Sequence, residues 1–450
     1  MITVIILVFI LGYIAITMEH GLKIDKLIPA LLMMTISWAL IAFNLDGITH
    51  WLSANNPLDI SSGSPQVAKW IGGHEEKLEM LNETVLHHFG KTAEILIFLM
   101  GAMAIVEMID HFEGFSAIKN LIKTKSKRKL LWIISFLAFF LSAIIDNLTA
   151  TIVLITILRK IFHSSEDRIW YAGFIIIAAN AGGAWTPIGD VTTTMLWMAG
   201  KVTSVKLIEL LFIPSLLNIL IPLLLSYFLP VFKGEIAGIK EEKDKNRLAK
   251  LMLFLGLGLI VFVPVFKTIT HLPPYLGMML SLSLFALVSE IVSNRKFKLQ
   301  SSNETHHHGP TLKALSKIEI PSVLFFLGIL MTVAALESLG VIFSLGQSVK
   351  TAGISENIFI IGLGIASAVI DNVPLVAASL GMFQIGPDAS VWHFIAYAAG
   401  TGGSILIIGS AAGVVAMGME KISFGWYFKK IAPLALLGYL AGIAWFLIFN

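Results

Sequence analysis

Long runs of apolar residues, repeated along the whole chain, constrain the fold more than any other feature. Eight runs have about the length that a helix needs to cross a hydrocarbon core of ~30 Å. They cover residues 2–18, 27–44, 92–110, 206–229, 249–266, 273–292, 320–343 and 428–449. Only 14% of the residues are charged, against roughly 25% in soluble domains. A backbone in lipid must satisfy its own hydrogen bonds, so we expect an all-α polytopic membrane protein and exclude a soluble enzyme.

Four further apolar stretches are interrupted or have an unusual length. Residues 169–199 and 392–419 contain the glycine-rich breaks NAGGAWTPIGD and GTGGSILIIGS, which indicate two broken helices. Residues 130–158 and 356–384 are long for one span and short for two, so each predicts a re-entrant hairpin. The same phrase lies inside both hairpins, as SAIIDN at 142–147 and SAVIDN at 367–372.

The two halves of the chain contain the same elements in the same order. We therefore predict two repeats, 1–232 and 246–450, with about ten transmembrane spans, two of them broken, and two hairpins. The two glycine-rich breaks contain identical residues at a constant offset of 220 positions. The matching pairs are Gly182 and Gly402, Gly183 and Gly403, Ile188 and Ile408, and Gly189 and Gly409. If each hairpin enters and leaves the membrane on one side, each repeat crosses the membrane five times. Because five is odd, the second repeat must be inverted relative to the first. The hairpin tips should then meet near the midplane, where transporters built from inverted repeats bind their substrates.

Basic residues in the loops predict the orientation, because short cytoplasmic loops are enriched in lysine and arginine. The loops on one side of the predicted topology hold 25 basic residues, and those on the other side hold 7. Both termini should therefore lie outside the cytoplasm. Hairpin 130–158 should enter the membrane from the cytoplasm and hairpin 356–384 from outside.

The repeated phrase places an aspartate at each hairpin tip, Asp146 and Asp371. A charge at this depth costs several kcal/mol unless it is paired or solvated, so both are candidate functional residues. The alternative is that each carboxylate caps a turn. Neutral oxygens beside them could complete a site for a small hard cation, and we expect Na+ at Asp146 and Asp371. These oxygens belong to Ser142, Asn147, Ser367 and Asn372.

The two broken helices add further polar candidates, and they differ from each other. The first contributes Asn180, Thr186, Asp190 and Thr192, and the second contributes Ser404 and Ser410. Asp190 is thus a third ionisable group near the site, with a helix cap as its alternative role. Glu107 and Glu337 occupy similar places late in matching spans, where each could serve the site or extend toward the membrane interface.

The phrases SAIIDN and SAVIDN, with the breaks NAGGAWTPIGD and GTGGSILIIGSAAG, resemble the NhaD-type sodium/proton antiporters of the ion transporter superfamily. The resemblance covers nearly the whole chain. It implies an elevator-like transporter, a homodimer in a bacterial-type inner membrane, that exchanges Na+ or Li+ for H+ without a cofactor or a nucleic-acid partner. It also implies a set of site residues, namely Asp146, Asn147, Asn180, Asp190, Thr192, Asp371 and Asn372.

Two other functions are compatible with parts of the pattern. Relatives on this scaffold transport dicarboxylates or arsenite, and fold alone does not fix the substrate. A site for a dicarboxylate should present neutral donors and helix N-termini, whereas this chain has aspartates at both tips, which favours a cation. Two convergent aspartates could also form an intramembrane protease dyad, but the chain has no GxGD stretch.

Overall fold

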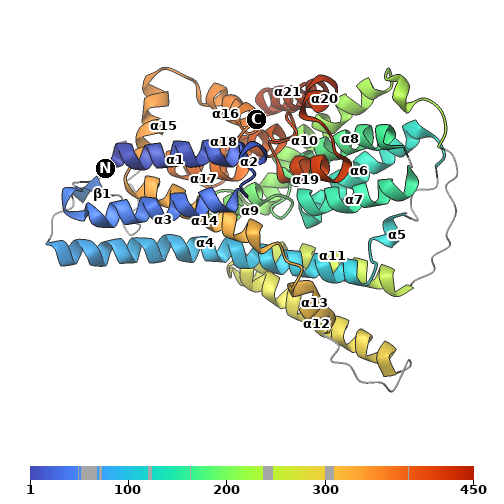
Figure 1. The fold of residues 1–450 in the computed structure, drawn as a ribbon, viewed down its shortest axis with the longest axis horizontal. Helices are drawn as coiled ribbons and strands as arrows, with labels where there is room; N and C mark the ends of the chain where they lie inside the picture. Colours follow the sequence, from blue (N-terminus) through green and yellow to red (C-terminus); the bar gives the residue numbers. More distant parts are fainter. Residues whose placement is uncertain are drawn as a thin grey trace.

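The structure is a computed structural model, and it describes residues 1–48, 50–51, 68–69, 73–119, 124–162, 164–236, 247–298, 309–383 and 385–450. These residues are almost entirely helical (Figure 1), as the apolar runs predict. Seven helices in this part of the chain are long and apolar enough to cross a membrane. They are α4 (His74–His111), α6 (Lys127–Ile145), α10 (Ser204–Ser226), α11 (Arg247–Thr270), α12 (Pro274–Lys298), α14 (Ile320–Ser338) and α21 (Ala432–Phe449).

The remaining elements are shorter. Two apolar helices, α1 (Ile2–Thr17) and α3 (Leu27–Phe43), correspond to the first two predicted spans. Short helices connect the longer ones: α2 (Glu19–Leu22), α5 (Ser116–Lys119), α13 (Pro310–Leu315), α15 (Val341–Thr351) and α20 (Phe424–Lys430), with 3-10 turns at Leu45–Gly47 and Pro230–Phe232. One small antiparallel pair joins β1 (His50–Trp51) to β2 (Ala68–Lys69).

Two helices have bounds that differ clearly from the predicted spans. The helix that contains the third predicted span, 92–110, begins earlier than the span, since α4 starts at His74 and continues without interruption for 38 residues. The span predicted to end at residue 343 ends at Ser338 instead. Gly340, with a φ of 73° that disfavours residues with a Cβ, turns the chain into α15. Most of the predicted junction between the repeats, residues 232–246, lies outside the described residues.

Both hairpin regions consist of two helices that meet at an aspartate. In the first, α6 ends at Ile145 and α7 (Asn147–Ile161) begins directly after Asp146. In the second, α16 (Glu356–Ala366) is followed by α17 (Asn372–Met382), whose N-cap is Asp371. The first pair thus extends a few residues beyond 130–158 at both ends, and the predicted end of the second, residue 384, is not described. Figure 1 shows the two pairs on opposite sides of α9.

The two apolar stretches with glycine-rich breaks are both divided into two helices. The first contains α8 (Ser165–Gly183) and α9 (Val191–Met198), and the second contains α18 (Ser390–Gly402) and α19 (Ala411–Glu420). Glycines at matching positions allow matching contacts: a Cβ on Gly182 would overlap the carbonyl oxygen of Phe139, and one on Gly402 would overlap that of Gly364. Each glycine therefore lets its broken helix pack directly on the backbone of its own hairpin.

The helices form two groups. The scaffold group consists of α1, α3, α4, α11, α12, α13 and α14, and the hairpin group consists of α6 to α9 and α16 to α19 with α10 and α21. Within the hairpin group α9 packs against α17 and α19 against α7, so each broken helix contacts the hairpin of the other half.

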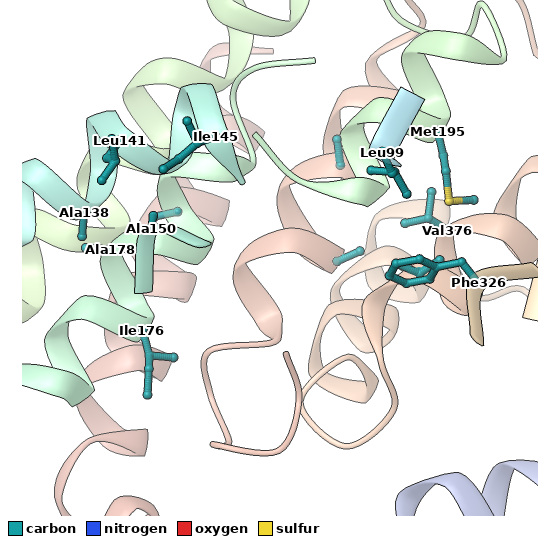
Figure 2. Packing of buried hydrophobic residues seen from close by; sticks show 14 of the residues in the cluster. Leu99, Ala138, Leu141, Ile145, Ala150, Ile176, Ala178, Met195, Phe326 and Val376 are labelled. Atoms are coloured by element: carbon teal, nitrogen blue, oxygen red, sulfur yellow. The ribbon is translucent and has the colours of Figure 1, made fainter. Parts of the chain in front are cut away.

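Buried side chains join the two groups along α9 and α17. Figure 2 shows Leu99 of α4 and Phe326 of α14 close to Met195 of α9 and Val376 of α17. A separate set in the same view packs α6, α7 and α8 together; it includes Ala138, Leu141, Ile145, Ala150, Ile176 and Ala178. The polar site lies where the groups meet.

Candidate ion-binding site

A cavity of about 60 Å³ lies at the boundary between the scaffold group and the hairpin group. It contains all three candidate aspartates, Asp146, Asp190 and Asp371. The wall from the scaffold group is mostly apolar; it includes Lys26, Phe98, Leu99, Met103, Ile260, Met278 and Phe326. A cavity needs about 10–15 Å³ of such water-accessible space to hold one water molecule, so this one has room for a small cation with a few waters. We call it the aspartate cavity.

Asp190 lies at the centre of the polar contacts. It is the N-cap of α9, and its Oδ1 accepts hydrogen bonds of 3.0 Å from both the backbone N–H and the hydroxyl of Thr192. The amide of Asn147 donates to its Oδ2 at 2.8 Å. The amide of Asn372 approaches the same carboxylate at 3.3 Å and 3.5 Å. The asparagines of the two repeated phrases therefore converge on one buried aspartate.

Asn180 connects this arrangement to the second broken helix. Its Oδ1 accepts from the Asn147 amide at 3.1 Å, and its own amide donates to the Ser410 hydroxyl at 3.0 Å. Asn180 is fully buried, and Ser410 is the N-cap of α19. The network thus runs from the first hairpin through both broken helices, and a fully satisfied buried network of this kind holds its members in fixed positions.

Asp146 has only neutral, local partners. One carboxylate oxygen accepts from the backbone N–H of Thr149 at 2.8 Å, and the other accepts from the Thr149 hydroxyl at 2.9 Å. Its φ of 85° lies in the left-handed region, which costs energy for a residue with a Cβ. The turn therefore holds this carboxylate at the start of α7.

Asp371 has a cationic partner. Its Oδ1 accepts from the backbone N–H of Val373 at 3.3 Å, and its Oδ2 lies 3.5 Å from the ammonium of Lys26. The same ammonium lies 4.5 Å from the centre of the Phe325 ring, a cation–π distance. Among the described residues, Lys26 is the one cationic side chain that lines the aspartate cavity. Lys26 lies in a connection between two apolar runs, and no local motif in the sequence indicates its role.

Four predicted hydroxyls bond to backbone carbonyls and do not line the aspartate cavity. Ser142 donates to the carbonyl of Ala179 at 2.6 Å, and Ser367 donates to that of Ala399 at 2.8 Å. These matching bonds attach each hairpin to its broken helix. Thr186 donates to the carbonyl of Ala143 at 2.7 Å, and Ser404 to that of Thr401 at 2.7 Å.

The two glutamates lie away from the aspartate cavity. The carboxylate of Glu107 is 3.7 Å from the ammonium of Lys317, and it lines a second, larger cavity. Glu337 lies near the end of α14, where its side chain is close to Gly381 of α17. Neither residue lines the aspartate cavity.

The site has oxygen donors but no ready-made metal centre. Within the described part of the chain, no three histidine or carboxylate side chains come together as a metal-binding group. A cation here would have to complete its coordination with amide, hydroxyl and water oxygens, which suits a weakly held, exchangeable ion.

Comparisons with known proteins show which family the chain belongs to. A family model described as "Citrate transporter" (CitMHS) matches residues 7–394. Sodium/proton antiporter 2 of Arabidopsis thaliana is 35% identical, and the alignment covers 98% of each protein. The Na(+)/H(+) antiporter NhaD of Vibrio cholerae is 31% identical over 99% of this chain and 91% of its own.

A solved structure shares the fold. The YdaH transporter of Alcanivorax borkumensis, which is described as having an unusual topology, superposes with a TM-score of 0.61 at 12% identity, over 93% of this chain and 98% of that one. These matches, together with the apolar helices, make the protein a multi-pass membrane transporter and not an enzyme. The chain belongs to the family that the citrate transporter model describes, and it is a member of the NhaD-type sodium/proton antiporter family.

Proposed function

We propose that the protein exchanges Na+ or Li+ for H+ across the membrane, and that the aspartate cavity binds either the cation or the protons. The observation that carries this proposal is the composition of the cavity. Three carboxylates line it, and within the described residues a single ammonium opposes them. Carboxylates in a confined polar site bind hard cations, and each of them can instead bind a proton.

The same contacts argue against citrate or another polyanion as the substrate. Helix N-termini attract anions, and four of them begin at the cavity, those of α7, α9, α17 and α19. The first three already have a carboxylate in the anion position, because Asp146, Asp190 and Asp371 accept backbone N–H groups of their own helices. The end of α19 is capped by the hydroxyl of Ser410, which accepts from the backbone N–H of Gly413. The capping role that the sequence left open is thus compatible with an ion site, and it places a carboxylate at three of the four helix ends, which disfavours a polyanion.

The position of the cavity supports an alternating-access mechanism of the elevator type. One wall belongs to the scaffold group and the other to the hairpin group. If the hairpin group moves relative to the scaffold group, Asp146, Asp190 and Asp371 travel with it and the site opens to either side in turn. Lys26 belongs to the scaffold side, so its contact with Asp371 would break and re-form during the cycle. We further propose the inverted repeat and the external termini that the sequence predicts, and the homodimer that the family resemblance implies.

Exchange can be tested with purified protein in liposomes that enclose a pH-sensitive dye. We expect NaCl or LiCl to drive proton movement, and we expect KCl, choline chloride and sodium-free citrate to drive none. Asp190→Asn should abolish the signal. Asp46→Asn, which removes a carboxylate exposed to solvent, is the matched control and should behave as the wild type. Citrate uptake without sodium-driven proton movement would refute the proposal.

The orientation can be tested separately, because the chain contains no cysteine. A single cysteine at Lys129, an exposed residue early in α6, should react with an impermeant thiol reagent only from the cytoplasm. A cysteine at Lys350, exposed in α15, should react only from outside. Reaction of both from the same side would contradict the inverted arrangement.

A further inference from the structure

A second cavity, larger than the aspartate cavity, lies between α4 and α7. Its volume is about 570 Å³. The wall on α7 follows one face of the helix at spacings of three to four residues; it comprises Leu148, Thr149, Ile152, Val153, Thr156, Ile157 and Lys160. The opposite wall is a similar stripe on α4, formed by Met103, Val106, Glu107 and Asp110. We call this space the vestibule.

The vestibule reaches from the end of α7 to the first hairpin tip. A helix rises about 1.5 Å per residue, so the stretch from Thr149 to Lys160 spans about 16 Å. At its deep end Thr149 lines the vestibule while its backbone N–H and hydroxyl donate to Asp146. At its other end lie Glu113 and Lys317, in loops on the side that the basic bias predicts to be cytoplasmic. The vestibule therefore connects that side of the membrane to Asp146 at the first hairpin tip.

Two apolar side chains separate the vestibule from the aspartate cavity. Met103 of α4 and Leu148 of α7 line both spaces. One belongs to the scaffold group and the other to the hairpin group, so a relative movement of the groups would change the gap between them. Narrow apolar constrictions block ions because water does not fill them.

The charges in the vestibule favour cations over anions. The acidic side chains that line it are Glu107, Asp110, Glu113 and Glu319, and the basic ones are Lys160 and Lys317. Lys317 lies 3.7 Å from Glu107 and partly neutralises it. An excess of one sign of charge in a cleft with low-dielectric walls raises the local concentration of counter-ions.

From these observations we propose that the vestibule is the route by which cations pass between the cytoplasmic side and the aspartate cavity, with Met103 and Leu148 as its gate. The inference deepens the proposed function and rests on it for the identity of the ion. The geometry of the route can nevertheless be tested by a measurement that does not depend on transport.

Thiol labelling provides this measurement. Thr156 is exposed on the vestibule face of α7, and the neighbouring Ile155 is fully buried in the helix packing. In a membrane vesicle, Thr156→Cys should react with the impermeant reagent trimethylammonium-ethyl methanethiosulfonate from the cytoplasmic side, and Ile155→Cys should not. Failure of Thr156→Cys to react, or its reaction only from outside, would overturn the route.

A transport measurement on the labelled protein tests whether blocking the vestibule stops exchange. After labelling, the bulky cation on Thr156→Cys should stop sodium-driven proton movement. The same label on Lys129→Cys, which is exposed and lines neither cavity, should leave transport unchanged. Undiminished transport by the labelled Thr156→Cys protein would also overturn the route.

The gate can be tested with a cysteine on its far side. Ala102 lines the aspartate cavity but not the vestibule. Leu148→Ala should accelerate the reaction of Ala102→Cys from the cytoplasmic side, because it widens the constriction. Leu158→Ala, which removes a fully buried side chain of the same helix, should not accelerate it. Equal rates in the two variants would rule out Leu148 as the gate.

These outcomes separate the two proposals. If Thr156→Cys reacts as expected but sodium moves no protons, the ion assignment fails and the route stands. If exchange is intact but the cysteines do not react as expected, the route fails and the exchange function stands.

Discussion

The two hairpin tips carry nearly the same six residues, but their aspartates have different partners. Asp146 accepts only from the backbone N–H and hydroxyl of Thr149. Asp371 lies 3.5 Å from the ammonium of Lys26. A carboxylate with neutral partners keeps its charge available to a cation, whereas one beside an ammonium is already balanced. Equivalent places in the predicted repeat therefore do not imply equivalent roles, and we expect Asp146 and Asp190 to hold the exchangeable ion while Asp371 anchors Lys26.

The largest effect should come from the aspartates without a cationic partner. Asp146→Asn and Asp190→Asn should each abolish sodium-driven proton movement, because an amide can neither balance Na+ nor take up the exchanged proton. The proteins should still insert and fold, since removing a charge from the membrane interior seldom harms folding. Dye-loaded proteoliposomes with equal amounts of each variant provide the measurement. Wild-type exchange by either variant would remove that residue from the ion site.

A charge-pair variant tests the second tip. Asp371→Asn alone should also lose most exchange, because it leaves the Lys26 ammonium unpaired in the cavity, where it repels a cation. Adding Lys26→Met removes that ammonium and should restore a large part of the activity. The same addition to Asp146→Asn should restore nothing. A double-mutant cycle of this kind isolates the coupling between the two side chains. If Lys26→Met restored exchange equally in both tip variants, the two aspartates would not differ in their dependence on Lys26.

Substitution of the asparagine at the first tip should reduce Na+ affinity more than substitution of the asparagine at the second tip. Asn147 donates to Asp190 at 2.8 Å and to Asn180 at 3.1 Å, whereas Asn372 approaches Asp190 no closer than 3.3 Å. Loss of a residue that supports an ion ligand typically costs about 10- to 100-fold in affinity. We expect Asn147→Ala to weaken apparent Na+ affinity near the upper end of this range and Asn372→Ala near the lower end. The reverse order would show that the second tip dominates.

The smallest effect should follow from removing the resident ammonium alone. Lys26→Met should leave exchange active and tighten apparent Na+ affinity by roughly tenfold, as expected for the loss of one interaction with a charged group. Lys23→Met, on an exposed lysine of the same connection, is the matched control. Sodium titrations of transport rate give the affinities. Weaker sodium affinity in Lys26→Met would mean that the lysine supports the site rather than competing with the cation.

Much of the fold could be predicted from the sequence, because apolar runs and glycine-rich breaks are local signals. The runs predict helices, and the breaks coincide with the ends of α8 and α18. The start of α4 could not be predicted in this way, since its polar first turns differ in composition from the span that they continue. The turn into α15 was missed because the sequence near Gly340 remains apolar on both sides.

The candidate site could be predicted in part. Aspartates and asparagines inside apolar stretches stand out, and the structure brings Asp146, Asn147, Asp190, Asp371 and Asn372 to one cavity. Hydroxyls are less informative, because a buried serine or threonine can bond to a nearby carbonyl instead of a ligand. The role of Lys26 depends on a contact across 345 residues of chain, and only the packed structure shows which carboxylate it meets.

Competition between Na+ and H+ for the aspartate cavity is the central claim, and proton release tests it most directly. Purified protein in weak buffer should release protons when NaCl is added and none when choline chloride is added, and Asp146→Asn and Asp190→Asn should each reduce the release. By linkage, sodium that displaces protons must bind more tightly as the pH rises. In the range where the site is protonated, apparent Na+ affinity should fall roughly tenfold for each unit of decreasing pH and each proton displaced. An Na+ affinity that is the same from acid to alkaline pH, with no proton release, would contradict the account.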